Sequence, residues 1–424
     1  MTIFASVESL DLASYIRPGD TVVIGQGLAE PTTLTQALVA QRETIGHCTL
    51  FVGPLYSSTF TTEHTDKFSF MSYCATGYNT KLVAHGALDV VLCNYSAVAS
   101  LFDEGRLASD VVVLLLSEDG SGRYNTGLVC DYTIEAARRA RTVIAEVSDR
   151  VPWTAGAELP ADIRVDLVVR TKREPLTLTR GDGTEAERKL AQNVAALIPD
   201  GSTVEIGIGT VPDLVLGALS GHRELGLHSG VIGDAVVELI HKGVITNTKK
   251  PFDQGVSTAC FVLGTRSVFD SVDRNPAVRL APTSHTHDIR VLAQLPNFRA
   301  VNAAMQVDIT GQVNTEVAGS HYIGAIGGQS DFTRGAYLSK GGRSVIMVNS
   351  TAKNGTISRI VPRLPDAVVS TARSDVDLIV SEWGVADLRG ASIRQRVARM
   401  CAIADPRFRE ELERQGHAML KAAV

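Results

Sequence analysis

The sequence predicts an α/β fold, because short apolar runs of strand length alternate with helical patterns along the chain. Five runs are rich in β-branched residues and lack polar alternation; they span residues 89–93, 110–116, 142–146, 344–348 and 376–380. Strands that are buried on both faces have this composition, and they belong to parallel sheets covered by helices. We therefore expect mainly parallel sheets with helices packed against them.

A repeated segment indicates two related domains in tandem. Residues 17–27 (RPGDTVVIGQG) reappear in similar form as residues 198–209 (IPDGSTVEIGIG), and a proline and a helical pattern follow both copies. Each copy predicts a turn, a short buried strand, a Gly-x-Gly loop and the start of a helix. Gly207 stands 182 residues after Gly25, which is close to half of the 424-residue chain.

A polar stretch between the two copies is the expected domain boundary. Residues 173–187 combine proline, glycine and charge, as linkers do. We place the boundary near residue 185, so the expected domains are residues 1–185 and 186–424. The length agrees with a division, since single hydrophobic cores stop growing near roughly 250–300 residues.

Composition and charge exclude several classes of protein. The chain is 44% hydrophobic, and its 41 basic residues against 46 acidic ones argue against a nucleic-acid partner. No apolar run reaches the roughly 18 residues of a membrane span, and the N-terminus lacks the pattern of a secretory signal. The six cysteines have no CxxC spacing, which favours reduced thiols over disulfides or a zinc site. We expect a cytoplasmic protein with no metal site and no membrane partner.

The glycine loops leave two interpretations open. One is a close strand-to-helix turn without a ligand, which is the more common use of a lone Gly-x-Gly. The other is a site for phosphates or oxyanions, in which helix N–H groups near Gly207 and Gly209 act as donors. Neither copy is a Walker loop or a complete GxGxxG, so a bound nucleoside triphosphate or dinucleotide is not favoured.

Five strings of the second half occur in a distinctive order. They read GLHSGVIGD at 226–234, GVITN at 243–247, GGQSDFTRGA at 327–336, TAKNGTISRIVP at 351–362 and SEWGVADLRG at 381–390. Together they resemble the acetyl-CoA hydrolase/transferase family, which includes 4-hydroxybutyrate, acetate and succinate CoA-transferases. Segments within 86–102 and 131–147 match as well, so the resemblance covers nearly the whole chain.

The resemblance implies a fold, a substrate and an assembly. It implies two CoA-transferase-type α/β domains with a coenzyme A thioester bound in the cleft between them, no tightly bound cofactor, and a homodimer. In the family's transferases, a glutamate carboxylate attacks the acyl-CoA carbonyl to give a mixed anhydride. The CoA thiolate then forms a glutamyl thioester, and a second carboxylate takes the CoA. Such a nucleophile must be ionised and desolvated, beside donors that stabilise the oxyanion.

The chain departs from the family pattern at the position of that glutamate. The transferases typically read G-I-H-T-E-M, where this sequence has GLHSGV at residues 226–231. Gly230 therefore occupies the expected glutamate position, and glycine has no side chain on which an acyl-enzyme could form. The resemblance therefore implies the family fold for this chain, but it does not imply the covalent mechanism.

Two candidate groups lie near the expected thioester carbonyl. The resemblance places the loop of Gly327, Gly328 and Gln329 beside that carbonyl, where backbone N–H groups can stabilise an oxyanion. It places Asn302 near the same carbonyl. Without the resemblance, the loop is a tight turn before strand-like residues 331–332, and Asn302 is a turn or cap residue.

Two cations are candidates for binding CoA. Lys353 and Arg359 lie in the string that approaches CoA in the family, and their charges suit its phosphates. Without the resemblance, both are surface charges. Gly207 and Gly209 of the second glycine loop complete the expected binding residues.

His228 and Asp234 are candidates for the acid or base of the reaction. An imidazole is suited to proton transfer near neutral pH, and His228 stands two residues before Gly230. The family has a histidine there too, so a structural role stays open. Asp234 reaches the cavity only if the stretch after Gly230 is helical; otherwise it is a cap or turn residue. Ser229 is a weaker candidate, because no His–Asp relay accompanies it in the sequence.

His285 and His287 differ from the family pattern in their region. Two positions apart, they share one face if this segment is a strand, which would form an acid/base pair or a weak metal site. A solvated loop is the alternative.

Three functions remain in competition. The first is hydrolysis of an acyl-CoA thioester, or direct acyl transfer or cyclisation, without a glutamyl intermediate. The second is a classical acyl-CoA:carboxylate CoA-transferase that uses another carboxylate. The third is a protein that binds a CoA ligand without catalysis, which the retained family strings disfavour.

Overall fold

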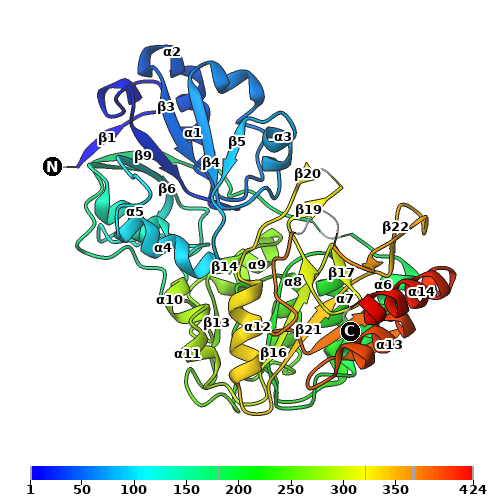
Figure 1. The fold of residues 1–424 in the computed structure, drawn as a ribbon. Helices are drawn as coiled ribbons and strands as arrows, with labels where there is room; N and C mark the ends of the chain where they lie inside the picture. The colour runs from blue at the N-terminus through cyan, green and yellow to red at the C-terminus, as the bar shows by residue number, and fades with distance from the viewer. Residues whose placement is uncertain (1, 180, 320, 365–367, 423–424) are drawn as a thin grey trace.

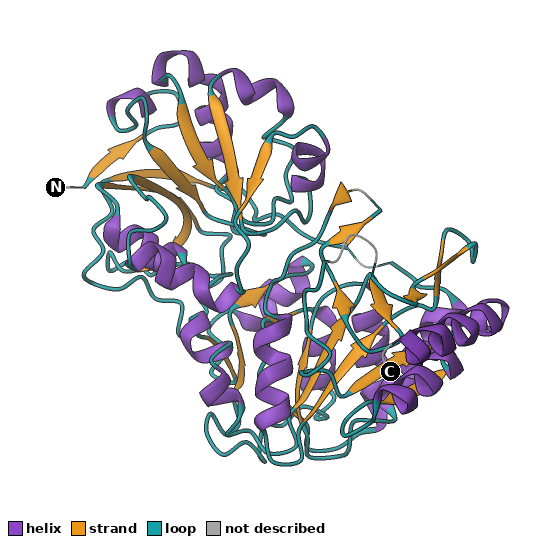
Figure 2. Ribbon diagram, viewed as in Figure 1, coloured by secondary structure: helices purple, strands orange, loops and turns teal. Residues whose placement is uncertain are grey.

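The chain forms two lobes (Figure 1). The computed structural model describes residues 2–179, 181–319, 321–364 and 368–422. Each lobe is built on a mainly parallel β-sheet with helices against its faces (Figure 2). The predicted α/β class is therefore confirmed. Among the described residues, no helix combines the length and apolarity needed to span a bilayer.

The first lobe contains a nine-stranded sheet. Its strands are β1 (Ile3–Ala5), β2 (Thr21–Ile24), β3 (Cys48–Phe51), β4 (Phe68–Ser72), β5 (Leu88–Val90), β6 (Val111–Glu118), β7 (Tyr124–Asn125), β8 (Thr142–Ser148) and β9 (Leu167–Thr171). The order is β1-β9-β8-β6-β2-β3-β4-β5, with β7 beside β6. Only β7 pairs antiparallel. β6 is buried over almost its whole length, which explains its uninterrupted apolar sequence.

Helices cover both faces of the first sheet. They are η1 (Leu12–Ser14), α1 (Thr32–Ala40), α2 (Arg42–Ile45), η2 (Thr62–Asp66), α3 (Asn79–Ala84), α4 (Tyr95–Asp103) and α5 (Thr133–Arg139). Side chains alternate between the faces of a strand. Val22 and Ile24 therefore pack in one core with Leu34 of α1, whereas Val23 packs in the opposite core with Val98 of α4.

The second lobe contains a six-stranded sheet. Its strands are β10 (Thr203–Ile206), β11 (Gly226–Leu227), β16 (Arg299–Ala303), β21 (Arg343–Met347), β25 (Leu378–Ser381) and β26 (Gly384–Asp387). The order is β11-β10-β16-β21-β25-β26, and only β26 pairs antiparallel. The repeated segments correspond to β2 and β10, each followed by its glycine loop and a helix.

The helices of the second lobe lie on both faces of its sheet. They are α6 (Glu185–Ala195), α7 (Thr210–Ala218), η3 (Leu219–Gly221), α8 (Asp234–His241), α9 (Arg266–Val272), α10 (Thr283–Thr286), α11 (Ile289–Leu292), α12 (Gln329–Leu338), α13 (Ile393–Ala402) and α14 (Pro406–Ala422). Val204 and Ile206 of β10 pack with Val194 of α6 on one face. Ala300 of β16 packs with Phe332 of α12 on the other.

Short strand pairs extend the second lobe. They are β12 (Val231–Ile232) with β14 (Phe261–Val262); β13 (Ser257–Ala259) with β15 (Val278–Leu280); β17 (Gln306–Asp308) with β18 (Val313–Asn314) and β24 (Ile360–Val361); β19 (Val317–Ala318) with β20 (His321–Tyr322); and β22 (Thr351–Ala352) with β23 (Ile357–Ser358). β14 lies where the two lobes meet (Figure 1).

Candidate active site between the lobes

The predicted Gly-Gly-Gln loop lies at the contact between the two lobes. The backbone N–H of Tyr95, at the start of α4, donates to the carbonyl of Gly327 over 2.9 Å. The Ser96 hydroxyl donates to the Asp331 carboxylate over 2.9 Å. Residues 331–332 belong to α12, so the strand-like alternative for them is wrong. The loop ends in a helix start held against the first lobe.

Gly230 and Gly328 face the same histidine ring. A Cβ added to Gly230 would lie 3.5 Å from His287 Nε2 and 3.7 Å from Phe332. A Cβ added to Gly328 would lie 2.6 Å from His287 Nε2, closer than real Cβ atoms come. Glycine is therefore required at 328, whereas position 230 accepts a Cβ at ordinary contact distances. The fold brings together two predicted site positions that are about a hundred residues apart.

Burial keeps His287 neutral. Its ring is fully enclosed, and this desolvation lowers the pKa of His287 to about 3. The Thr286 hydroxyl lies 2.8 Å from His287 Nδ1, and the rings of Tyr95 and Phe332 lie 5.3 and 4.4 Å away, centroid to centroid. Both expectations for this segment, a strand face and a solvated loop, are wrong, because α10 turns His285 and His287 towards different neighbours.

His228 is also buried and neutral. It directly follows β11, and its Nε2 lies 3.2 Å from the Thr286 carbonyl. Burial, with the charge of Lys250 beside it, lowers the pKa of His228 to about 3. At this pKa the ring is a poor proton carrier near neutral pH, which favours the structural role that the sequence left open.

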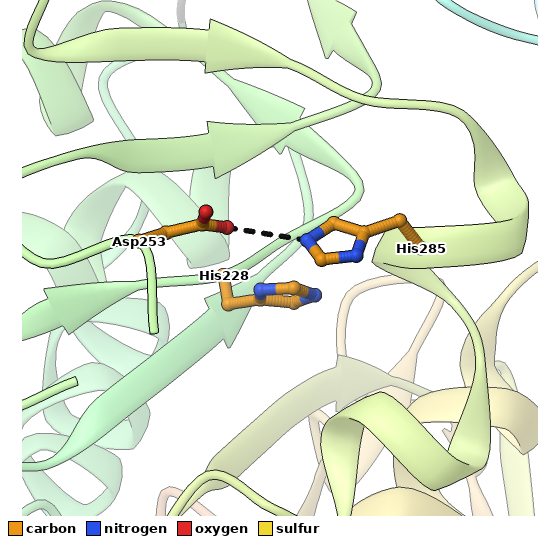
Figure 3. Close-up of side chains that lie close together, drawn as sticks. All are labelled: His228, Asp253 and His285. Carbon is orange, nitrogen blue, oxygen red and sulfur yellow. Dashed lines mark hydrogen bonds and ion pairs between the residues drawn. The ribbon is translucent and has the colours of Figure 1, made fainter. Parts of the chain in front are cut away.

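His228 belongs to a cluster with Asp253 and His285 (Figure 3). Each of the three offers a ligand atom, and these atoms lie within 4.8 Å of one another. The Asp253 carboxylate already accepts from Arg279 over 3.1 Å and lies 3.2 Å from His285 Nε2. Lys250 adds positive charge beside the same carboxylate. A divalent cation would have to compete with these two cations, so the cluster is better suited to positioning the histidines than to holding a metal.

Asn302 leads to a residue that the sequence reasoning missed. From β16, Asn302 Nδ2 donates to Glu205 Oε2 of β10 over 2.8 Å. Burial raises the pKa of Glu205 to about 8. The repeat contains the signal that could have identified Glu205. When its two copies are aligned, Glu205 falls in the predicted buried strand, where the first copy has Val23.

The second glycine loop opens onto free space. A Cβ added to Gly207 would meet no atom within 4 Å. Gly209 has a φ of +130° and directly precedes α7. With Asp234 and Leu263 among the other lining residues, Gly209 borders a cavity of about 200 Å³. This loop retains room for a ligand beside a helix start.

Asp234 and Ser229 are held in structural hydrogen bonds. The stretch after Gly230 forms β12 and is not helical, so the condition under which Asp234 would reach the position of Gly230 is not met. Asp234 starts α8, and its carboxylate accepts from the backbone N–H of Thr265 over 3.2 Å. The Ser229 hydroxyl donates to the carbonyl of Ile206 over 3.1 Å.

The structure places the remaining predicted residues differently. Gln329 donates through Nε2 to Thr371 Oγ1 over 3.0 Å, so its side chain is anchored within its lobe. Lys353 is exposed in the turn of the β22–β23 hairpin, and Arg359, half-buried, directly follows it. This hairpin projects from the second lobe, away from α10 and α12 (Figure 1). The two cations therefore do not join the cluster around His287.

Two family models match the chain. The acetyl-CoA hydrolase/transferase N-terminal domain matches residues 5–174, and the C-terminal domain of the same family matches residues 264–416. The 4-hydroxybutyrate coenzyme A transferase of Clostridium kluyveri is 37% identical over 403 residues, which are 94% of each chain. The succinyl-CoA:cyclohexane-1-carboxylate CoA transferase of Geobacter metallireducens is 31% identical over 97% of this chain and 94% of its own length.

Solved structures agree with these sequence matches. RipA of Yersinia pestis is similar with a TM-score of 0.92 and 31% identity, over 98% of this chain and 97% of its own. The 4-hydroxybutyrate CoA-transferase of Porphyromonas gingivalis has a TM-score of 0.82 at 32% identity, with the same coverage. This chain therefore belongs to the acetyl-CoA hydrolase/transferase family of enzymes.

Proposed function

We propose that the protein acts on an acyl-CoA thioester without a glutamyl intermediate, by hydrolysis or by direct acyl transfer or cyclisation. The observation that carries the proposal is Gly230. It faces His287 and Phe332 beside the Gly-Gly-Gln loop, with no side chain of its own. Where the family resemblance implies a nucleophilic carboxylate, this chain has no side chain.

The start of α12 supports the proposal with donors for an oxyanion. The first N–H groups of an α-helix have no partner within the helix, and they carry its positive dipole end. Here they begin next to Gly328, which touches the neutral ring of His287. A thioester carbonyl placed over this helix start would have its developing negative charge stabilised.

Direct attack then replaces the two-step exchange. The oxygen of water, or of a nucleophile within the bound substrate, attacks the thioester carbonyl from the side that Gly230 leaves open. The attacking oxygen loses its proton, the tetrahedral oxyanion collapses, the C–S bond breaks, and the departing CoA thiolate takes up a proton. Because nothing is bonded to the protein, no acyl group is stored between substrates.

A classical CoA-transferase is the second candidate. It is favoured by the names of the relatives, several of which are CoA transferases, and by Glu205 as another carboxylate of the second lobe. In that reaction Glu205 would itself form the mixed anhydride. We rank it lower, because Glu205 lies on a strand and its carboxylate is buried and bonded to Asn302.

Cellular setting and assembly follow the family resemblance. We propose a cytoplasmic homodimer that takes CoA thioesters as substrates and has no tightly bound cofactor. All six cysteines are unpaired, which supports a reducing compartment. Binding of the CoA phosphates by Lys353 and Arg359 is part of this proposal, and it requires the projecting hairpin to contact the nucleotide end of a long ligand.

One assay separates the candidates. The purified protein is incubated with a panel of acyl-CoAs, with and without acetate, while free thiol and CoA exchange are measured. Thiol release that does not need the acceptor supports direct attack. Acceptor-dependent exchange with ping-pong kinetics supports the classical transferase. An absence of turnover overturns both, and retained CoA binding would then indicate a non-catalytic binding protein.

Two substitutions at Gly230 refine this test. Gly230→Glu supplies the carboxylate that the family pattern has, and the backbone there is outside the left-handed region. We expect it to lower acceptor-independent thiol release and to introduce CoA exchange. Gly230→Ala is the matched control, because its methyl group adds no charge. A folded Gly230→Glu protein that behaves like Gly230→Ala would contradict the assignment of this position.

A further inference from the structure

We infer that Glu205 is the general base of this site and removes the proton from the water that attacks the thioester. The inference rests on the proposed function and deepens it by naming the group that activates the nucleophile. It is carried by the position of Glu205 in the sheet, by the open space at Gly207 two residues further along, and by the lack of a charged partner for its carboxylate.

The register of the sheet places Glu205 beside His228. In the parallel pairing of β10 with β11, Val204 is opposite Leu227. The next residue, His228, continues the ladder, since its N–H donates to the Val204 carbonyl over 3.1 Å. On the other side, Glu205 is opposite Ala300 of β16. Residues in register on neighbouring strands point to the same face of a sheet. Glu205 therefore stands between His228 and Ala300.

That face of the sheet is the one that carries the candidate site. Val204 and Ile206, the neighbours of Glu205 in β10, point into the core against α6. Glu205 consequently points the other way. Ala300, on the same side, packs in one cluster with Phe332 of α12. Phe332 is the residue that also faces Gly230.

Open space lies beside the glycine loop that follows Glu205. Gly207 follows two residues after Glu205, and nothing lies within 4 Å of a Cβ added there. A Cβ added to Gly230 would meet His287 and Phe332 at ordinary contact distances of 3.5–3.7 Å. Asn302 is half-buried two residues beyond Ala300, so its side chain borders the same region. Water can occupy a polar space of this kind next to a carboxylate and an amide.

Few groups hold Glu205 in place. Among the described residues, Asn302 is the only side chain that hydrogen bonds its carboxylate, and a backbone hydrogen bond at Val301 is its second partner. No charged group contributes to the shift of its pKa. Glu146, an equally buried carboxylate of the first lobe, accepts from Thr33 and Thr171 through three hydrogen bonds. A buried carboxylate with two donors and no charged partner is costly, and such groups concentrate at functional sites.

The charges around Glu205 are compatible with the role of a base. His228 at the end of β11 and His287 after α10 are neutral, because burial lowers the pKa of each to about 3. On α12, Asp331 has a pKa raised to about 6 and is held by Ser96. Lys250, which donates to the Leu227 carbonyl, has a pKa lowered to about 8. Burial raises the pKa of Glu205 to a similar value, so it exchanges protons near neutral pH.

The step conserves atoms and charge. The Glu205 carboxylate takes a proton from water while the water oxygen bonds to the thioester carbon. The oxyanion collapses, the C–S bond breaks, and the Glu205 carboxyl returns its proton to the CoA sulfur. The products are the free carboxylic acid and CoA with its thiol restored.

The test compares Glu205→Gln with the unmodified protein over pH 5–10. We expect kcat for thiol release to fall about 10²- to 10⁴-fold, as for a lost general base, with KM changed less than about threefold. In the unmodified protein, kcat rises with pH and levels off near pH 8; in Glu205→Gln this inflection disappears. Because Lys250 titrates in the same range, loss of the inflection is the decisive readout.

Three controls make each outcome informative. Glu146→Gln removes a buried carboxylate from the first lobe and should keep both the rate and the inflection. Glu205→Asp keeps the acid one methylene shorter; it carries the test if Glu205→Gln does not fold, and should lower kcat while retaining an inflection. Gly230→Ala adds a methyl group at position 230 and leaves Glu205 unchanged, so it measures the effect of the added volume alone.

The failures of the two proposals are distinguishable. If the unmodified protein releases no thiol from any acyl-CoA, the proposed function and this role are both overturned. If the unmodified protein is active and Glu205→Gln keeps its rate within threefold, or keeps the inflection at a lower rate, only the role of Glu205 is overturned.

Discussion

The two glycine loops of the repeat are built alike and surrounded differently. In the first lobe, a Cβ at Gly25 would lie 2.9 Å from the Ala29 carbonyl, and one at Gly27 would touch Leu263 of the other lobe at 3.5 Å. In the second lobe, a Cβ at Gly207 would meet nothing within 4 Å. The same local sequence therefore serves packing in one lobe and leaves space in the other.

The first loop is closed by Gln26. This side chain is fully buried, and it donates to the Tyr95 hydroxyl over 3.0 Å and to the Asp131 carboxylate, while Tyr73 donates to it over 2.8 Å. Gly53 approaches so closely that a Cβ there would overlap Gln26. A satisfied polar network of this kind favours one packing arrangement of the lobe.

The strand before each loop shows the complementary difference. Val23 in β2 packs in an apolar core, whereas Glu205 takes its place in β10 beside Asn302. The first lobe places polarity in the loop and keeps the strand apolar. The second lobe has a carboxylate in the strand below an open loop, an arrangement that costs stability and suits chemistry.

The largest expected effect is on the pH dependence of stability at Glu205. Between its ordinary pKa of 4.5 and its raised pKa of about 8, the unfolded chain ionises Glu205 while the folded protein keeps it protonated. The stability of the unmodified protein therefore falls as pH rises through this window. In Glu205→Gln this contribution is absent, and the free energy of unfolding should gain roughly 3–5 kcal/mol relative to the unmodified protein across the window. Denaturant unfolding at several pH values measures this difference. If the free energy of unfolding changed with pH equally in the unmodified protein and in Glu205→Gln, the raised pKa of Glu205 would be contradicted.

Gln26→Leu should destabilise the first lobe, because it removes the hydrogen bonds that Gln26 makes in the first glycine loop. The change leaves the Asp131 carboxylate and the hydroxyls of Tyr73 and Tyr95 without their shared partner in a buried site. We expect a loss of about 2–4 kcal/mol in the free energy of unfolding at pH 7. Gln36→Leu, on the exposed side of α1, is the control and should stay within about 1 kcal/mol. Equal losses in the two variants would show that the network adds no stability.

Gly25→Ala should strain the first loop without removing a hydrogen-bonding group. The added methyl lies 2.9 Å from a backbone oxygen, and backbone atoms cannot move aside as a flexible side chain can. We expect a loss of about 1–3 kcal/mol, measured as a lower midpoint of thermal or denaturant unfolding.

Gly207→Ala is the matched change in the second loop and should have the smallest effect. With no atom within 4 Å of the new methyl group, the free energy of unfolding should change by about 0.5 kcal/mol or less. A loss as large as that of Gly25→Ala would mean that the second loop is closed in solution, and the comparison between the two loops would fail.

Particular residues show how far sequence reasoning reached. Residues 110–116 were predicted as a doubly buried strand, and residues 111–116 form the first part of β6, because an unbroken apolar run is compatible with few other environments. A helix after Gly230 was the condition for Asp234 to reach the cavity, with a cap or turn residue as the alternative; β12 intervenes and Asp234 begins α8. Two residues of strand carry too little pattern to be predicted. His287 was assigned to a strand or loop, and its enclosure depends on Gly328 and Phe332, which lie far along the chain.

The sequence by itself determined the class of fold and the family, because these depend on local pattern and on ordered strings, and it predicts two related domains from the repeat. It also showed that glycine stands at residue 230. Only the tertiary structure decided that His287 and Phe332 surround that glycine, and that β10 presents Glu205 on the face that α12 covers. Those contacts join segments separated by tens of residues or more, and their protonation is set by burial, which no single segment encodes. The carboxylate two residues before Gly207 could therefore be recognised as a candidate base only after the chain had folded around it.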